Sequence, residues 1–129
     1  MKKEWVAPWI AALESEKYKQ VTSKLHDYKG HCCLGVACEV VILQQQDLHF
    51  PNAGPWEDHG TGYSLFGSSA VPPKEILTQL GFRAEAGEFE IPAPEVGCMK
   101  NTFSLTELND AGFTFAQIAD VVRYFWKEL

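Results

Sequence analysis

Three of the four cysteines stand close together in an apolar stretch, and their position suggests thiol chemistry. The stretch runs from His31 to Cys38 and contains the adjacent pair Cys32 and Cys33. Apolar residues fall on nearly every side of a helical wheel here, which predicts a buried central helix over residues 32–45. A helix N-terminus lowers the pKa of a thiol and favours the nucleophilic thiolate, so Cys32 and Cys33 are candidate nucleophiles.

A cysteine nucleophile also needs a base and a group that orients the base. Candidates elsewhere in the chain are His31, His49 and His59 for the base, and Asp58 and Asn52 for the orienting group. In the competing interpretation the cysteines are small hydrophobic residues of a core helix, which is the commonest place for a free cysteine. We favour the core interpretation and expect no catalytic residues. In the enzyme alternative, a small hydrolase or transferase, Cys32, Cys33 and His59 would carry the reaction.

A zinc site would need four ligands, usually supplied as closely spaced pairs of cysteine or histidine. At about 100° per helical residue, Cys33 and Cys38 lie about 140° apart, and Cys32 and Cys38 about 120° apart. Neither pair converges from one face of a helix. The remaining candidates, which could join such a site only through the tertiary fold, are Cys98, His49 and His59. We therefore expect no metal and no cofactor.

Residues 44–72 have no clear periodicity and are rich in glycine, proline and aromatic residues. A connection of this length on a small domain usually has a binding role. Its aromatic rings could stack on a flat ligand or anchor a protein partner, while neighbouring polar groups would give directional contacts. The residues that we expect to bind a ligand or partner are Trp56, Glu57, Asp58, His59 and Tyr63.

Several elements are expected to surround the central helix. Apolar residues at helical spacing predict a helix over residues 4–16 and a short one over 73–80, which Gly81 ends. Weaker signals predict a minor β element over residues 20–25 or a small hairpin over residues 82–91. These segments would pad the helical core.

The C-terminal quarter carries two N-terminal capping boxes, each a Ser or Thr followed three residues later by Glu or Gln. They are Ser104 with Glu107 and Thr114 with Gln117. The boxes predict a helical hairpin formed by residues 104–111 and 115–128. Its last helix presents more aromatic side chains than one buried face takes up, so self-association through Tyr124, Phe125 and Trp126 stays open.

A DNA-binding regulator is a third functional alternative. Residues 112–120 resemble the first helix of a helix-turn-helix unit, but the chain ends before a groove-reading helix could follow. The net charge is −6 and the sequence pI is about 5.1, which argues against a phosphate-binding face. We therefore expect no nucleic-acid partner.

Three features of the sequence indicate the compartment. No apolar run approaches the roughly 20 residues that span a bilayer, and the N-terminus lacks the apolar region of a signal peptide. Four cysteines with an adjacent pair fit reduced thiols better than a disulfide framework. We expect a cytoplasmic protein with no membrane partner.

Four short patterns, taken in order, resemble a known group. They are Trp9-x-x-Ala12-Leu13, Tyr18-x-Gln20, Cys32-Cys33-Leu34-Gly35-Val36 and Leu105-x-x-Leu108-Asn109-Asp110. The group consists of small, largely uncharacterised proteins encoded by bacteriophages and prophages, with a Cys-Cys-Leu-Gly-Val box and a Leu-Asn-Asp box. Its members often have a tyrosine where this chain has His31. The resemblance implies a phage-type accessory protein of the bacterial cytosol and no particular reaction.

Together these features predict an α-rich α+β fold. We expect a single domain over residues 1–129, with a buried central helix, a C-terminal helical hairpin and a minor β element. The favoured function is non-catalytic binding at the phage–host interface. The expected partner is a host protein, for example one of a defence system, or a small nucleotide-like signal that the protein sequesters.

Overall fold

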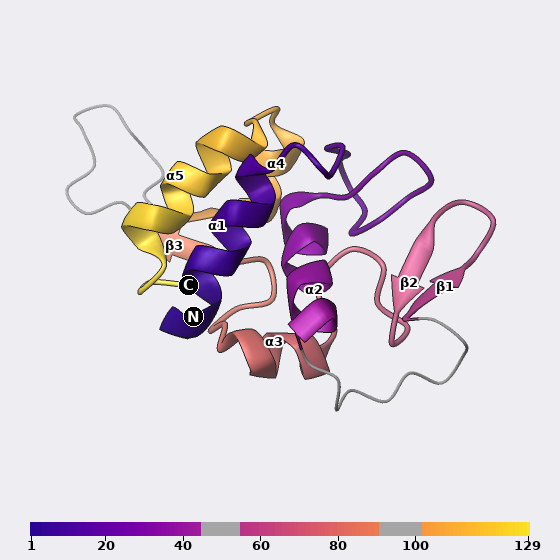
Figure 1. Cartoon of the computed structure of the whole chain (residues 1–129), viewed down its shortest axis with the longest axis horizontal. Helices are drawn as coiled ribbons and strands as arrows, with labels where there is room; N and C mark the ends of the chain where they lie inside the picture. The colour runs from indigo at the N-terminus through magenta and orange to yellow at the C-terminus, as the bar shows by residue number, and fades with distance from the viewer. Residues whose placement is uncertain (45–54, 91–101) are drawn as a thin grey trace.

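The computed structural model describes residues 1–44, 55–90 and 102–129 and shows a small protein of mixed α+β architecture (Figure 1). Its helices are the 3-10 turn η1 (Lys3–Trp5), α1 (Val6–Glu14), α2 (Cys33–Gln44), α3 (Lys74–Leu80), α4 (Leu105–Asp110) and α5 (Phe115–Phe125). Its strands are β1 (Trp56–Asp58), β2 (Tyr63–Leu65), β3 (Glu88–Glu90) and β4 (Thr102–Ser104). Among the described residues, no helix combines the length and apolar character needed to cross a membrane.

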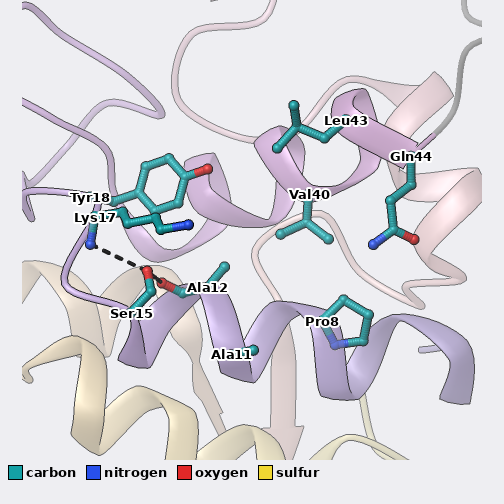
Figure 2. A pocket seen from close by; sticks show the side chains of 9 residues that line it. All are labelled: Pro8, Ala11, Ala12, Ser15, Lys17, Tyr18, Val40, Leu43 and Gln44. Carbon is teal, nitrogen blue, oxygen red and sulfur yellow. Dashed lines mark hydrogen bonds between the residues drawn. The ribbon is translucent and has the colours of Figure 1, made fainter.

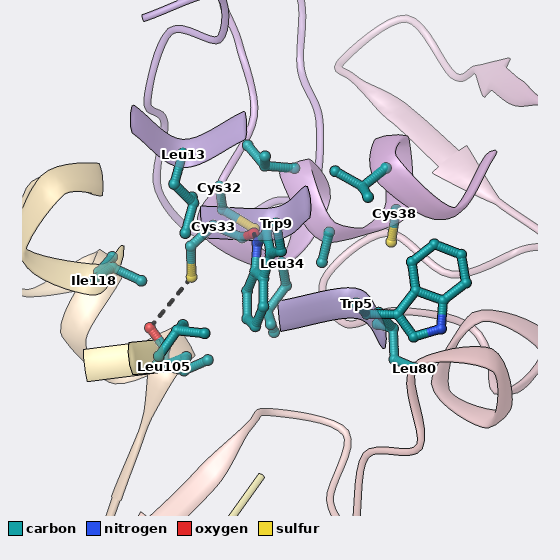
Figure 3. Packing of buried hydrophobic residues seen from close by; sticks show 14 of the residues in the cluster. Trp5, Trp9, Leu13, Cys32, Cys33, Leu34, Cys38, Leu80, Leu105 and Ile118 are labelled. Carbon is teal, nitrogen blue, oxygen red and sulfur yellow. Dashed lines mark hydrogen bonds between the residues drawn. The ribbon is translucent and has the colours of Figure 1, made fainter. Parts of the chain in front are cut away.

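Helix α2 lies at the centre of the core, as its apolar wheel predicts. The residues from Cys33 to Cys38 are all buried, and α1, α3 and α4 pack against the helix. Figure 3 shows how Trp9 and Leu105 close around the first turn of α2. The indole Nε1 of Trp9 donates a hydrogen bond to the carbonyl of Cys33 at 3.1 Å, so this ring is buried with its polar atom satisfied.

Local signals account for the ends of the other helices. The predicted stop at Gly81 is confirmed, since this residue has a φ of +72° and its N–H donates to the carbonyl of Leu77. The capping box of Thr114 and Gln117 has both of its hydrogen bonds, and it begins α5. The C-terminal helical hairpin is therefore present, although α5 ends at Phe125 and not at residue 128.

The strands and their pairing differ from those that the sequence predicts. Residues 20–25 form no strand: Gln20 makes an isolated bridge to His31, and His26, just after this stretch, makes another. The expected hairpin over residues 82–91 is also wrong: β3 pairs with β4, with Phe89 opposite Phe103. Within the expected loop 44–72, strands β1 and β2 form an antiparallel hairpin with Trp56 opposite Leu65. Because β3 and β4 are distant in sequence, their pairing leaves no local signal in the sequence.

The connection between α1 and α2 crosses the first turns of α2 at very short range. The N–H of Cys32 donates to the carbonyl of Leu25 at 3.0 Å, which fixes this crossing. A Cβ added at Gly35 would lie 1.8 Å from that same carbonyl oxygen. Only glycine therefore fits at residue 35, where the two backbones touch.

Asn109, in the last turn of α4, joins three parts of the chain through one buried side chain. Its Oδ1 accepts hydrogen bonds from the N–H of Cys33 at 3.1 Å and from Nε2 of Gln20 at 2.9 Å. Its Nδ2 donates to the carbonyl of Val21 at 2.8 Å. The neighbouring Asp110 accepts a hydrogen bond from the N–H of Ser23. These two residues thus link distant segments, in addition to standing at the end of a helix.

The contact at Gly35 predicts a large loss of stability in Gly35→Ala. The added methyl group collides with backbone, which cannot turn aside, so we expect the free energy of unfolding to fall by at least about 2 kcal/mol. Gly62→Ala is the matched control, because its Cβ would meet the flexible end of Lys24 at 3.3 Å. Urea unfolding of both variants measures the difference, and equal midpoints would contradict the prediction.

Asn109→Ala should destabilise the protein by about 3 kcal/mol, since it leaves a buried N–H and a carbonyl without their partners. Asp110→Asn serves as control, because its amide oxygen still accepts the hydrogen bond from Ser23 in an exposed position. Thermal and urea unfolding would report the loss. The free energies of unfolding of the two variants should differ clearly. A difference of less than about 1 kcal/mol would refute the role assigned to the Asn109 amide.

Candidate functional site

The cysteines of α2 lie in the core, where burial opposes ionisation. Cys33 is fully buried and its Sγ donates a hydrogen bond to the carbonyl of Leu105 at 3.6 Å (Figure 3). Burial raises the pKa of Cys32 to about 11 and raises the pKa values of Cys33 and Cys38 well above the ordinary range. The arrangement therefore opposes the reactive thiolate that a helix N-terminus could have produced.

The histidines considered as bases have partners other than a thiol. Nε2 of His31 lies 3.2 Å from Oε1 of Glu39. Nε2 of His59 lies 2.5 Å from Oγ of Ser64 and 3.8 Å from Oε2 of Glu57. Both partners of His59 meet the same ring nitrogen, whereas a catalytic triad places nucleophile and acid on opposite nitrogens. The other expected candidates, which lie outside the described residues, are His49, Asn52 and Cys98.

The five residues expected to bind a ligand or partner all belong to the β1–β2 hairpin, which stands apart from the helical body (Figure 1). Burial divides them into two sets. Trp56 and Tyr63 are half-buried and contact two histidines below the hairpin. Asp58 and His59, at the turn end of the hairpin, are exposed. Glu57 is half-buried, on the strand face opposite to that of Trp56 and Asp58. The hairpin thus has an attached side and a free end.

Below the hairpin lies a histidine–aromatic cluster, which we define as His26, His31, Glu39, Trp56 and Tyr63. The imidazole rings of His26 and His31 stack at 3.8 Å with an interplanar angle of 7°. The ring of Tyr63 also stacks on His26, at 4.4 Å, so His26 is sandwiched between the two. Trp56 meets His26 edge-on at 5.0 Å. The cluster joins the hairpin to α2.

Hydrogen bonds fix the orientation of the cluster. Nδ1 of His26 lies 2.8 Å from the carbonyl of Gly30, and Nε1 of Trp56 donates to Oε1 of Glu39. Burial lowers the pKa of His26, so this imidazole is neutral at pH 7. Burial and the negative charge of Glu39 raise the pKa of Tyr18, whose ring meets His31 edge-on. The cluster therefore places the carboxylate of Glu39 against the rings of His31 and Trp56.

A second candidate site is a groove between α1 and α2, with a volume of about 460 Å³ (Figure 2). Small residues of α1, among them Ala11 and Ala12, form one wall, while Val40 and Leu43 of α2 form the other. Leu43 is 70% exposed, which leaves the groove open to solvent. Lys17 supplies its charged group. The groove could hold an apolar body with one negative charge.

Helix α5 lacks the free positive charge that DNA binding requires, and it exposes fewer aromatic side chains than self-association through this helix requires. Arg123 forms ion pairs with Asp120 and with Glu14 of α1, so these two carboxylates compensate the charge that would attract a phosphate. Of the three aromatic residues considered for self-association, Tyr124 is 82% exposed. Phe125 and Trp126 are half-buried against the core instead.

Sequence reasoning missed His26 and Glu39 as members of a site. Two signals could have found them. In the sequence, His26 and His31 flank the turn-forming run Asp27-Tyr28-Lys29-Gly30, which returns the chain upon itself and can bring the two histidines together. Glu39 is a charged residue inside an otherwise apolar buried helix, where a carboxylate needs partners.

Mass mapping after treatment with iodoacetamide at pH 8 tests the state of the thiols. The raised pKa lowers the thiolate fraction of Cys32 about 100-fold, and burial restricts access further. We expect Cys32, Cys33 and Cys38 to remain unmodified until urea unfolds the protein. A Ser69→Cys variant provides an exposed thiol as positive control. Rapid labelling of Cys32 or Cys33 in the native state would restore the enzyme alternative.

Comparison with known proteins supplies a family. A model described as "Domain of unknown function (DUF8296)" matches residues 1–125. No curated protein and no solved structure matches the chain. The family match includes the α2 core, the histidine–aromatic cluster and the C-terminal hairpin as far as Phe125. The chain therefore belongs to the DUF8296 family.

Proposed function

We propose that the protein is a non-catalytic accessory factor of a bacteriophage that binds a host protein in the bacterial cytosol. The binding surface would be the free end of the β1–β2 hairpin with the adjacent Tyr28, called here the hairpin face: Tyr28, Glu57, Asp58 and His59. The observation that carries the proposal is Tyr28, an exposed aromatic side chain held in one orientation.

Two contacts fix Tyr28 although 54% of its surface is exposed. Its hydroxyl donates a hydrogen bond to Oδ1 of Asp58. Its ring meets Tyr63 edge-on, with centroids 5.3 Å apart and planes at 89°. An exposed tyrosine usually loses rotamer freedom when it binds a partner, and here that freedom is already restricted. Rigid aromatic anchors of this kind dominate the energy of many protein interfaces.

The charge of the hairpin face indicates the kind of partner. The hydrogen bond from Tyr28 lowers the pKa of Asp58, which is therefore negatively charged at pH 7. Glu57, the preceding residue of β1, adds a second carboxylate at the same end of the hairpin, on a chain whose net charge is −6. A basic surface on the host protein would be attracted to this face and would bind it faster.

The phage origin and the role against host defence rest on the resemblance of the Cys-Cys-Leu-Gly-Val and Leu-Asn-Asp boxes to phage and prophage proteins. Burial of the cysteines supports a binding role over a hydrolase, because no described thiol is both exposed and easily ionised. The −6 net charge supports a protein partner over DNA.

The groove between α1 and α2 favours a second candidate, the sequestering of a small molecule. Its volume of about 460 Å³ falls within the range of ligand sites, and Lys17 and Tyr18 could meet an anionic group and a planar one. A small nucleotide-like signal has both groups. The groove and the hairpin face involve different residues, so mutation separates the two candidates.

Site-directed photo-crosslinking in host cells tests the proposal. A photoreactive phenylalanine analogue replaces Lys29, which is exposed next to Tyr28, or Lys74, which is exposed on α3. We expect one discrete host protein to crosslink from residue 29 and not from residue 74. Tyr28→Ala should weaken this binding about 30-fold, corresponding to about 2 kcal/mol for an anchor residue.

Tyr124→Ala, which removes another exposed tyrosine, should leave the crosslink unchanged. Identical products from residues 29 and 74, or a product that Tyr28→Ala does not affect, would overturn the proposed hairpin face. A native mass spectrum with extra mass that is lost on denaturation, together with no crosslinked protein, would favour the small-molecule candidate.

A further inference from the structure

His26, His31 and Glu39 bring together the ligand atoms of a metal site. One potential ligand atom from each residue lies within 4.8 Å of the other two, and all three residues are half-buried. Two histidines with one carboxylate form a known donor set for zinc and related divalent ions, and it leaves coordination positions open. The residues come from both sides of the 27–30 turn and from α2, so only the fold assembles them.

The tautomer of His26 is the one that a metal ligand bound through Nε2 requires. The carbonyl of Gly30 can only accept, so Nδ1 of His26 carries the proton and donates at 2.8 Å. Nε2 of the ring therefore keeps a free lone pair. Histidines that bind metals almost always donate the other ring N–H to a carboxylate, a backbone carbonyl or a water, and Gly30 supplies such a carbonyl here.

His31 and Glu39 already have the separation of two ligands on one ion. Nε2 of His31 lies 3.2 Å from Oε1 of Glu39. A tetrahedral Zn²⁺ ion with bonds of about 2.0–2.1 Å separates neighbouring ligand atoms by about 3.3 Å. A bound ion would replace the proton between these two atoms. The indole Nε1 of Trp56 donates to the same carboxylate and holds it in place.

We propose that His26, His31 and Glu39 bind one divalent transition-metal ion of the zinc class, with a remaining position for water or a ligand. This site revises the expectation of no metal, which rested on the spacing of the cysteines. The ion would connect α2 to the segment that carries the β1–β2 hairpin. The inference does not depend on the proposed host partner.

Binding requires one local rearrangement. The lone pair of an imidazole lies in the plane of its ring, whereas the rings of His26 and His31 are stacked at 7°. One ring must tilt before both nitrogens can face a single ion. Because Tyr63 and Trp56 contact His26, the environment of Trp56 should change when the ion binds.

Calorimetric titration of the full chain with ZnCl₂ tests the site. We expect one ion per chain with micromolar or tighter affinity, and at least about tenfold weaker binding in His26→Ala and Glu39→Gln. Glu39→Gln retains an oxygen that can accept from Trp56 and His31, which favours an intact fold. His59→Ala is the matched control, since this histidine of the same hairpin lies outside the donor set and should leave affinity unchanged.

Titration with Co²⁺ identifies the ligands by absorption. Nitrogen and oxygen ligands give d–d bands without the intense sulfur-to-metal charge-transfer band that cysteine ligands would add. Circular dichroism of the metal-free variants verifies that they are folded. Absence of binding to the folded wild type, a thiolate band, or unchanged affinity in both His26→Ala and Glu39→Gln would each overturn the proposal.

Discussion

The amide of Asn109 is the interaction on which the arrangement of the helices depends. One buried side chain receives the N–H of Cys33 at the start of α2, receives Gln20 and donates to Val21. It therefore caps α2 from a different helix and fixes the 20–21 segment beside α4. Because a buried amide left without these partners would cost several kcal/mol, α2, α4 and this segment are stable only together.

The two sequence boxes of the family resemblance meet at this junction. The backbone N–H of Cys33, in the Cys-Cys-Leu-Gly-Val box, donates a hydrogen bond to Asn109 of the Leu-Asn-Asp box. The thiol of Cys33 donates a hydrogen bond to the carbonyl of Leu105. Gly35 of the same box admits the carbonyl of Leu25. The boxes thus specify a packing junction of the core. Cys32 and Cys33, which begin the Cys-Cys-Leu-Gly-Val box, are both buried at this junction.

The histidine–aromatic cluster and the β1–β2 hairpin are positioned by segments that pack at this junction. The backbone contact between Leu25 and the first turn of α2 places His26 and His31 beside Glu39, and these rings support the β1–β2 hairpin. The hairpin in turn positions Asp58 to hold Tyr28. A metal ion at His26, His31 and Glu39 would strengthen this same connection. The free end of the hairpin and the packing of the core are consequently linked through one small cluster.

The sequence by itself determined the helices, their caps and the burial of α2, because 3.6-residue periodicity and capping boxes are local patterns. The β1–β2 hairpin lies in the long connection over residues 44–72, where the absence of clear periodicity gives no strand prediction. The tertiary structure alone decided that β3 pairs with β4 and that His26 stacks on His31 next to Glu39. The same holds for the pKa of Cys32: a helix N-terminus favours a thiolate locally, whereas desolvation by residues distant in sequence opposes it and prevails. Contacts of this kind depend on which segments meet in space, and a local pattern contains no such information.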